Sequence, residues 1–145
     1  MKIDQNIKYG STTITQKKYI EEMLIKFQMN DSKKNPTPAI YEEENKEHQH
    51  VLFSDLKLYQ EAIGSLIYLT TCTRYDITYA VNMCARAMAE PKNRDWTAVK
   101  RIFRYLAGTK EFGITYYRSD KLIIEAYSDA DWAGCTETRR SVSGS

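Results

Sequence analysis

Three consecutive stretches of apolar residues at helical spacing fill the middle of the chain and constrain its fold more than any other feature. The stripes consist of Tyr59, Ala62, Ile63, Leu66, Ile67 and Leu69; Ile77, Ala80, Val81, Cys84 and Met88; and Trp96, Val99, Phe103 and Leu106. Apolar residues that recur every three or four positions fall on one face of an α-helix. Such faces pack against one another, so the sequence predicts three helices in a bundle.

Single residues mark the expected ends of these helices. Asp76 is a good N-cap for the second helix, because its carboxylate can accept hydrogen bonds from free backbone amides. Pro91 is expected to end that helix, and Gly108 to end the third in the left-handed conformation. Gly64, inside the first helix, is expected to allow close approach of another element.

The residues before the bundle predict a β-hairpin followed by a fourth helix. Ile3 and Ile14 are apolar points on two short strands within residues 1–15, and Tyr9-Gly10-Ser11 supplies the turn. Thr15 is expected to cap the helix, and Asn30-Asp31-Ser32 to end it. The apolar stripe of this helix is Tyr19, Ile20, Met23, Leu24 and Phe27.

After the bundle, the pattern changes to the alternation typical of strands. Residues 113–117 and 122–127 predict two strands joined by a turn at 118–121. The predicted fold class is therefore α+β: an N-terminal β-hairpin, a bundle of about four helices, and a C-terminal β-hairpin.

Composition divides the chain into four predicted regions: 1–40, 41–53, 54–110 and 111–145. Pro36 and Pro38 exclude a helix around them, and residues 41–50 are acidic and almost without apolar side chains, which predicts a linker. His48 and His50 in this linker could form a weak metal-binding pair. Two solvated loop histidines are the favoured interpretation.

Cysteine content and hydropathy exclude secreted and membrane-spanning classes. Cys72, Cys84 and Cys135 are odd in number and lack metal-binding spacing, so we expect free thiols in a reducing compartment. Neither a leader-like start nor an apolar run of 18 residues is present. We expect an intracellular protein, cytoplasmic or nuclear, without a membrane partner.

A basic helix face is the first feature that could carry function. Arg94, Lys100, Arg101 and Arg104 fall in one sector of the third bundle helix, opposite its apolar stripe. A net charge of +2 does not indicate nucleic-acid binding by itself, but a basic face suits a phosphate backbone. The alternative is a solvated outer face without a ligand.

Asp129 and Asp131 are the second feature. Two carboxylates one residue apart on an extended segment point to the same side and suit Mg²⁺ or Mn²⁺. Hydrolysis with two metal ions needs further carboxylates from other elements, and only Glu137 follows Asp131. A turn or capping role for the pair stays open.

Several segments, in order, resemble the Pol polyproteins of copia-type LTR retrotransposons. They are Thr15 to Ile20 and Phe27 to Met29; Thr37-Pro38; Tyr59 to Leu69; Thr73-Arg74-Tyr75-Asp76-Ile77; Trp96 with Lys100 to Thr109; and Tyr127-Ser128-Asp129-Ala130-Asp131-Trp132-Ala133-Gly134. The resemblance covers almost the whole chain except the acidic linker and residues 1–10.

The resemblance implies the end of a reverse transcriptase, with thumb-like and connection-like helices, running into the start of a ribonuclease H domain. It implies that the polymerase carboxylates lie before this segment. It also implies that Asp129 is the first of four acidic residues of a Mg²⁺-dependent ribonuclease H site, with Asp131 in a supporting or neutral role.

Three positions depart from the family pattern. Tyr75 stands where the family usually has proline, Cys135 where it usually has an acidic residue, and Ser145 where it usually has an aromatic residue. Cys135 does not occupy a position that binds metal in the family.

Three hypotheses follow. The chain is part of a polyprotein that contacts an RNA–DNA or DNA duplex through its basic helix face and is not catalytic alone. Alternatively, it is a Mg²⁺-dependent hydrolase of RNA in hybrids, completed by carboxylates from elsewhere. The third hypothesis is a protein-interaction module that can self-associate through an exposed strand edge.

Overall fold

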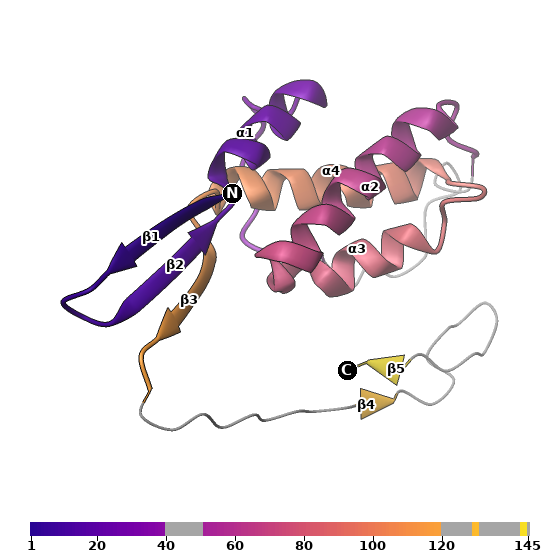
Figure 1. The fold of residues 1–145 in the computed structure, drawn as a ribbon. Helices are drawn as coiled ribbons and strands as arrows, with labels where there is room; N and C mark the ends of the chain where they lie inside the picture. Colours follow the sequence, from indigo (N-terminus) through magenta and orange to yellow (C-terminus); the bar gives the residue numbers. More distant parts are fainter. Residues whose placement is uncertain (40–50, 120–128, 131–142, 145) are drawn as a thin grey trace.

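The computed structural model describes residues 1–39, 51–119, 129–130 and 143–144 (Figure 1). Some predicted features lie outside these residues. They are residues 41–50 of the acidic linker with His48 and His50, the strand and turn at 120–127, Asp131, and Cys135.

A three-stranded antiparallel sheet extends from one side of the helical bundle (Figure 1). Its strands β1 (Lys2–Asn6), β2 (Ser11–Thr15) and β3 (Gly113–Tyr117) lie in the order β1-β2-β3. The predicted N-terminal hairpin is confirmed, with Ile3 opposite Ile14. Gly10 adopts φ +60° in its turn, a conformation that glycine takes without steric cost.

The pairing of β3 with β2 was not predicted, because the sequence pattern gave β3 a partner in the following residues. Ile114 lies opposite Ile14, and the hydroxyls of Thr13 and Thr115, 102 residues apart, are 3.0 Å from each other. Gly113 permits the pairing, since a Cβ at this position would collide with the backbone oxygen of Ile14. The sheet therefore brings distant parts of the chain together.

The outer edges of β1 and β3 have no strand partner among the described residues. Unpaired edges of this kind can add a strand from another chain. Self-association through a strand edge stays a prediction.

The helices follow the predicted order, and the α+β class is confirmed. The elements are α1 (Lys17–Lys26), α2 (Leu56–Cys72), a 3₁₀ turn η2 (Tyr75–Ile77), α3 (Thr78–Ala85) and α4 (Asn93–Gly108). Two short strands, β4 (Asp129–Ala130) and β5 (Ser143–Gly144), pair antiparallel.

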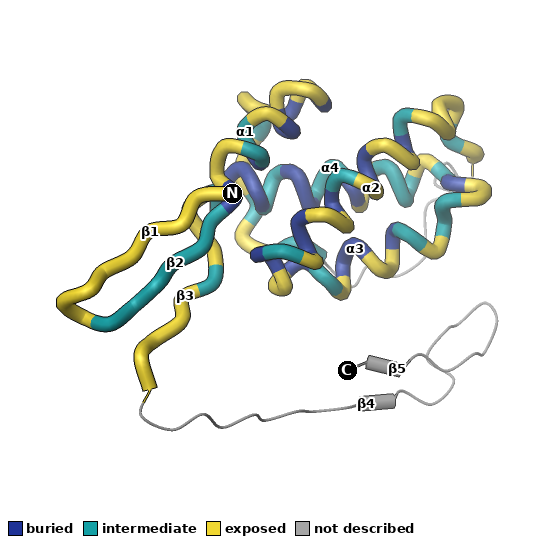
Figure 2. The backbone as a smooth tube through the Cα atoms, in the orientation of Figure 1, coloured by how far each residue is buried: buried dark blue, intermediate teal, exposed yellow. Residues whose placement is uncertain are grey.

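The core lies where the four helices face one another (Figure 2). No residue of β1, β2 or β3 is buried. The buried apolar residues are Ile20, Met23, Leu24, Phe27, Met29, Tyr59, Ala62, Ile63, Leu66, Leu69, Ile77, Ala80, Val81, Cys84, Val99, Ile102, Phe103, Leu106 and Ala107. The predicted stripes supply most of this set. Ile67 is an exception with 39% of its surface exposed, because it lies about 40° beyond Ile63, outside the arc of buried residues on α2.

Cys84 is part of the core, as predicted. Its side chain is 5% exposed, and burial raises the pKa of its thiol to about 12. The Tyr59 hydroxyl donates to the Cys84 carbonyl oxygen at 2.7 Å. Cys84 therefore packs as a neutral thiol.

The start and end of α1 differ from the sequence prediction. Thr15 is the last residue of β2, and Gln16 is the N-cap without a capping side-chain hydrogen bond. The helix ends at Lys26, before residues 30–32, because Gln28 adopts φ 56° and lets the Met29 amide donate to Leu24 at 2.7 Å.

Asp76 and Gly108 also act differently from the prediction. Asp76 lies in η2, whereas the N-cap of α3 is Ile77, which makes no capping side-chain bond. Gly108 is the last residue of α4, but its φ is not positive. Asp76 has another partner, Arg74, described below.

Within the described residues, no helix combines the length and the apolar character needed to cross a bilayer.

Gly64 gives a test of the packing around α2. A Cβ added there would meet nothing within 4 Å, so the expected close approach is absent. We expect Gly64→Ala to raise the free energy of unfolding by about 1 kcal/mol, because alanine is the better helix former. Denaturant unfolding measures this. The matched change Gly113→Ala should destabilise the protein, and a stabilising effect there would contradict the β2–β3 pairing.

Candidate nucleic-acid interface

Helix α4 carries all four predicted basic residues, and its beginning is fixed by contacts with residues 51–53. The Asp95 carboxylate accepts from the Lys92 amide at 2.8 Å, which caps the helix. The amide of Phe53 donates to the Pro91 carbonyl oxygen, and that of Asn93 to Val51. The first turn of α4 is therefore held in place by backbone contacts.

Aromatic stacking fixes the apolar side of α4. Trp96 stacks on Phe53 with ring centroids 4.9 Å apart, and Phe103 stacks on Phe27 of the α1 end at 5.1 Å. The orientation of α4 about its own axis follows from these contacts. The opposite side of the helix is thereby turned away from the core.

The four basic residues share that opposite side. Arg94, Arg101 and Arg104 are spaced by seven and three residues and form one row along α4, with Lys100 beside Arg104. All four side chains are half-buried and not fully exposed. The structure thus places the four predicted residues on one side of α4, where neighbouring atoms partly shield their side chains from solvent.

The segment that follows α1 lies against the C-terminal half of this side of α4. The Asn35 amide donates to the Arg104 carbonyl oxygen at 3.3 Å, and the Arg101 Nη2 donates to the Thr37 hydroxyl at 2.9 Å. The Lys34 side chain lies against Gly108. Residues 34–37 therefore run along the C-terminal half of α4 in the opposite direction.

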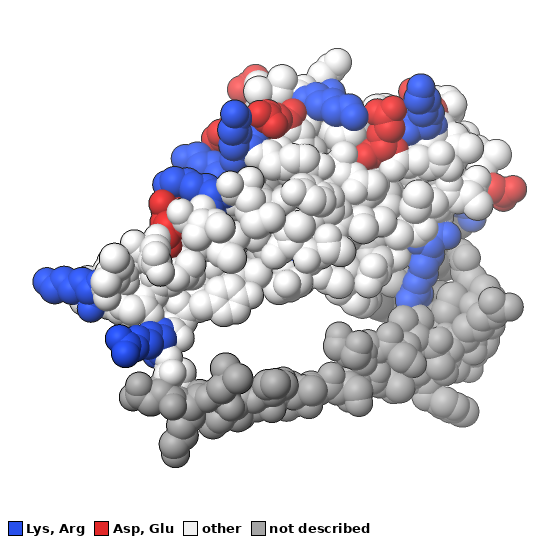
Figure 3. All heavy atoms as spheres, in the orientation of Figure 1, with Lys and Arg blue, Asp and Glu red and all other residues white. Residues whose placement is uncertain are grey.

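Several lysines away from this side of α4 are compensated by ion pairs. Lys17 pairs with Glu111, Lys26 with Glu61 and Lys110 with Glu21. On the face shown in Figure 3, Lys and Arg side chains gather over the hairpin and α1 with acidic side chains among them, and the surface over α2 and α3 is mostly uncharged. Glutamates therefore compensate the charges of Lys17, Lys26 and Lys110.

The cations on the α4 side are less compensated. The Nε of Arg94 lies 3.7 Å from the Asp95 carboxylate. Lys100 and Arg104 form no ion pair within the part of the chain that the structure describes. The Nε of Arg101 is buried without a hydrogen-bond partner. Lys100 and Arg104 are thus available to an anionic ligand.

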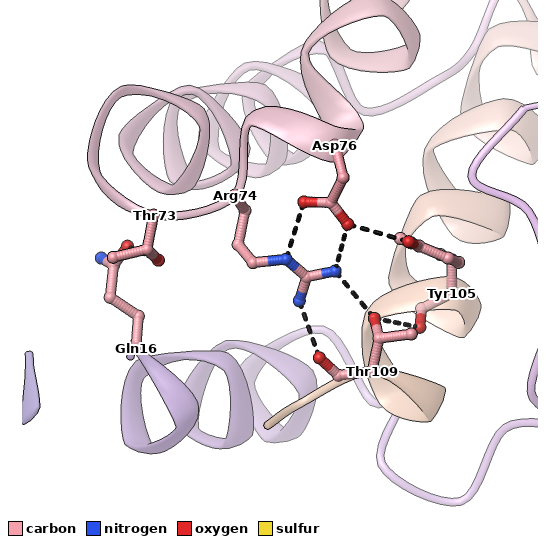
Figure 4. A network of polar contacts seen from close by, with 6 residues as sticks. All are labelled: Gln16, Thr73, Arg74, Asp76, Tyr105 and Thr109. Atoms are coloured by element: carbon pink, nitrogen blue, oxygen red, sulfur yellow. Dashed lines mark hydrogen bonds and ion pairs between the residues drawn. The ribbon is translucent and has the colours of Figure 1, made fainter. Parts of the chain in front are cut away.

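A buried arginine fixes the C-terminal end of α4 (Figure 4). Arg74, fully buried, donates to both carboxylate oxygens of Asp76 at 2.9 and 2.7 Å. Its Nη1 and Nη2 also donate to the carbonyl oxygen and hydroxyl of Thr109 at 2.9 and 2.7 Å. The Tyr105 hydroxyl donates to Asp76 at 2.8 Å. We call Arg74, Asp76, Tyr105 and Thr109 the Arg74 network.

The network changes the acidity of two of its members. Partial burial would raise the pKa of Asp76, but hydrogen bonds from Arg74 and Tyr105 overcome it and hold that pKa below its usual value. Burial and the hydrogen bond to Asp76 raise the pKa of Tyr105. Asp76 is therefore a carboxylate, and Tyr105 a neutral donor, at neutral pH.

The structure gives little on the predicted metal site. Asp129 lies in β4 with Gly144 of β5 opposite, and its side chain is outside the description, as is all of Asp131. Among the described residues there is no group of three His, Cys, Asp or Glu side chains that could hold a metal ion. The Mg²⁺ ligands stay a prediction, and no chemical step is derived from them.

Sequence reasoning missed Thr37, Asn35 and Arg74 as residues that shape this interface. Their partners are 35 to 69 positions away in the chain, and no periodic pattern relates them. A signal was present for Arg74, since both its own segment and the segment of Tyr105 and Thr109 carried the family resemblance.

Comparisons with known proteins identify the family. The chain is 39% identical to an uncharacterized mitochondrial protein of Arabidopsis thaliana over 131 residues, which are 90% of this chain and 54% of that protein. It is 37% identical to the retrovirus-related Pol polyprotein from transposon RE2 of the same plant over 131 residues, 90% of this chain and 9% of the polyprotein. It is 35% identical to the retrovirus-related Pol polyprotein from transposon TNT 1-94 of Nicotiana tabacum over 150 residues, which cover 90% of this chain and 10% of that polyprotein.

The chain belongs to the copia-type retrotransposon Pol family. It spans about half of the mitochondrial relative and about a tenth of the polyproteins, so it corresponds to a part of Pol. No protein-family model and no solved structure matches it.

In this Pol segment, two of the blocks that carry the resemblance bind each other. Thr73 to Ile77 contains Arg74 and Asp76, and the block that ends α4 contains Tyr105 and Thr109. Tyr75, which replaces the usual proline, is 60% exposed and lies outside the network. The Arg74–Asp76 pair forms without that proline.

The Arg74 network predicts a pH-dependent stability difference. We expect Arg74→Met to lower the free energy of unfolding at neutral pH by about 1.5–3 kcal/mol, because Asp76 and Thr109 lose charge-assisted hydrogen bonds. The pKa of Asp76 is lower in the folded chain, so the part of this stability that comes from the Asp76 carboxylate is fully present above about pH 4 and is lost as the pH falls through the folded pKa. Denaturant unfolding of both proteins across this range measures the difference.

The matched control is Arg86→Met, because Arg86 is an exposed arginine at the end of α3. Its effect should stay within about 0.5 kcal/mol. Equal effects of the two substitutions, or a difference from wild type that persists unchanged at acid pH, would contradict the role given to Arg74.

Proposed function

We propose that this part of Pol is the end of the reverse transcriptase running into the start of the ribonuclease H domain, and that it contacts a nucleic-acid duplex through the basic side of α4. The duplex is RNA–DNA or DNA. The segment binds and is not catalytic alone. Its expected location is intracellular, cytoplasmic or nuclear.

One observation carries the proposal. Lys100 and Arg104 project from a rigidly packed helix, beside Arg94 and Arg101, and form no ion pair in the described residues. Lys100 and Arg104 are therefore two cations on one side of α4 that no carboxylate among the described residues compensates, whereas Lys17, Lys26 and Lys110 pair with glutamates. The relatives are named as Pol polyproteins of transposons, which supports a nucleic-acid ligand.

The physical basis is release of counterions from the duplex. Each Lys or Arg that neutralises a phosphate releases condensed cations, so binding weakens as salt rises with a slope of about 0.9 per contact on a log–log plot. From Arg94 to Arg104, α4 rises about 15 Å, which matches about four phosphates along one strand. The row therefore fits the duplex backbone.

The test is the salt dependence of binding to a short labelled RNA–DNA duplex, measured by fluorescence anisotropy. We expect Lys100→Gln with Arg104→Gln to weaken binding and to reduce the log–log slope by about 1.8, two phosphate contacts. Glutamine keeps much of the side-chain length, which limits effects on packing.

The matched control is Lys57→Gln with Arg86→Gln, which removes the same charges from exposed positions on α2 and after α3. This pair should leave the slope unchanged. Equal slopes for the two double variants would refute binding through α4, and an absence of binding by the wild-type chain would refute the function.

The position of Asp129 favours a second candidate, a Mg²⁺-dependent hydrolase of RNA in hybrids. Asp129 lies on β4, which pairs antiparallel with β5, and the family resemblance implies that it is the first carboxylate of a ribonuclease H site. Mg²⁺ would be held by Asp129, with Asp131 beside it, only in a site completed by further carboxylates.

We expect the 145-residue chain to leave a labelled RNA–DNA hybrid uncut in the presence of Mg²⁺, because Asp129 and Asp131 cannot hold two metal ions. Gel analysis of the labelled RNA strand measures this. Cleavage by the wild-type chain that is abolished by Asp129→Asn would overturn the non-catalytic assignment.

A further inference from the structure

The segment 33–37 does more than cover α4, because it adds positive charge to the same side. Lys33 and Lys34 are exposed, and the stem of Lys34 lies against Gly108 at the end of the basic row. Neither lysine forms an ion pair within the described residues. Lys34 therefore continues the row where α4 itself ends, and Lys33 is the residue next to it in the chain.

Arg101 holds this segment in place. Its Nη2 donates to the Thr37 hydroxyl at 2.9 Å, and its Nε is buried. The backbone contact from Asn35 to Arg104 lies beside it. A guanidinium used in this way has fewer donors left for a phosphate than the Arg104 guanidinium has.

We propose that the phosphate-binding surface is composite: Lys33 and Lys34 bind the duplex backbone together with Lys100 and Arg104, and Arg101 is a positioning residue that acts through Thr37. This inference rests on the proposed duplex binding and refines it. It adds two residues that the helix pattern did not identify, and it gives Arg101 a different role from its neighbours.

A cation that is already held in place binds a phosphate backbone with a smaller loss of conformational entropy than a mobile one. A lysine on a free segment loses conformational entropy when it binds, whereas one on a segment already hydrogen-bonded to α4 loses less. The hydrogen bonds at Asn35 and Thr37 fix the backbone next to Lys33 and Lys34. The backbone that carries these lysines is therefore held against the same helix as Lys100 and Arg104.

The experiment measures anisotropy with the same labelled RNA–DNA duplex between 50 and 200 mM salt. We expect Lys33→Gln with Lys34→Gln to reduce the log–log slope by about 1.8, so that the wild-type chain loses about 12-fold more affinity than the variant over this range. The pair Lys57→Gln with Arg86→Gln again serves as the control of equal charge.

Thr37→Val tests the positioning role, since it removes the acceptor for Arg101 and changes no charge. We expect it to weaken binding and to reduce the slope in the wild-type background, and to have no further effect when Lys33 and Lys34 are already glutamine. A loss of fold stability alone would not change the slope, and thermal melting of each variant controls for it.

The outcomes separate this inference from the proposed function. If the wild-type chain binds and the Lys100/Arg104 variant is impaired, but the Lys33/Lys34 variant keeps the wild-type slope, the composite surface is wrong and duplex binding stands. If Thr37→Val acts equally in both backgrounds, the positioning role of Arg101 is wrong.

If the wild-type chain does not bind the duplex, both the proposed function and the composite surface fail. A further arm uses poly-glutamate as competitor. Displacement of the duplex by poly-glutamate at the same charge concentration as by unlabelled duplex would show that the surface takes acidic protein equally well, and would overturn the duplex as its specific partner.

Discussion

The burial of one arginine determines how the parts of this fold are joined. A guanidinium removed from water must have its donors satisfied, and Arg74 meets this demand with Asp76 and Thr109. Those partners lie at the turn between α2 and α3 and at the point where α4 leads into β3. The neighbouring Thr73 hydroxyl donates to the buried Gln16 at 2.6 Å, where β2 leads into α1. Both strands β2 and β3 thus leave the bundle close to this network.

The Arg74 network also fixes the position of the basic side of α4. Tyr105 and Thr109 tie the last turns of the helix to Asp76 and Arg74, and aromatic stacking at Trp96 and Phe103 prevents rotation about the helix axis. Charged residues on a helix fixed in this way keep constant distances from one another. A surface of this kind can select the spacing of phosphates, whereas flexible basic segments attract polyanions with less regard to geometry.

The elements with local causes could be predicted from sequence, and the contacts between distant residues could not. Helical periodicity located α2 and α4, and turn chemistry at Gly10 located the first hairpin. Thr15 was expected to be a cap and Asp76 likewise, because each has the right side chain in the right place. In the fold Thr15 is the last residue of β2, and Asp76 holds the guanidinium of Arg74, whose burial requires a partner for its charge. The prediction of a basic row on α4 had the right residues, but not the segment that lies along it.

By itself, the sequence determined which stretches form helices, which faces of them are apolar, and the membership of the chain in a Pol family. These depend on the order of residues within one or two turns, or on similarity to relatives. Only the tertiary structure decided that β3 pairs with β2, that Arg74 is buried, and that Lys34 lies against the end of α4. Each of these is a contact across many residues, and its free energy arises only when packing of the apolar faces has brought both partners together.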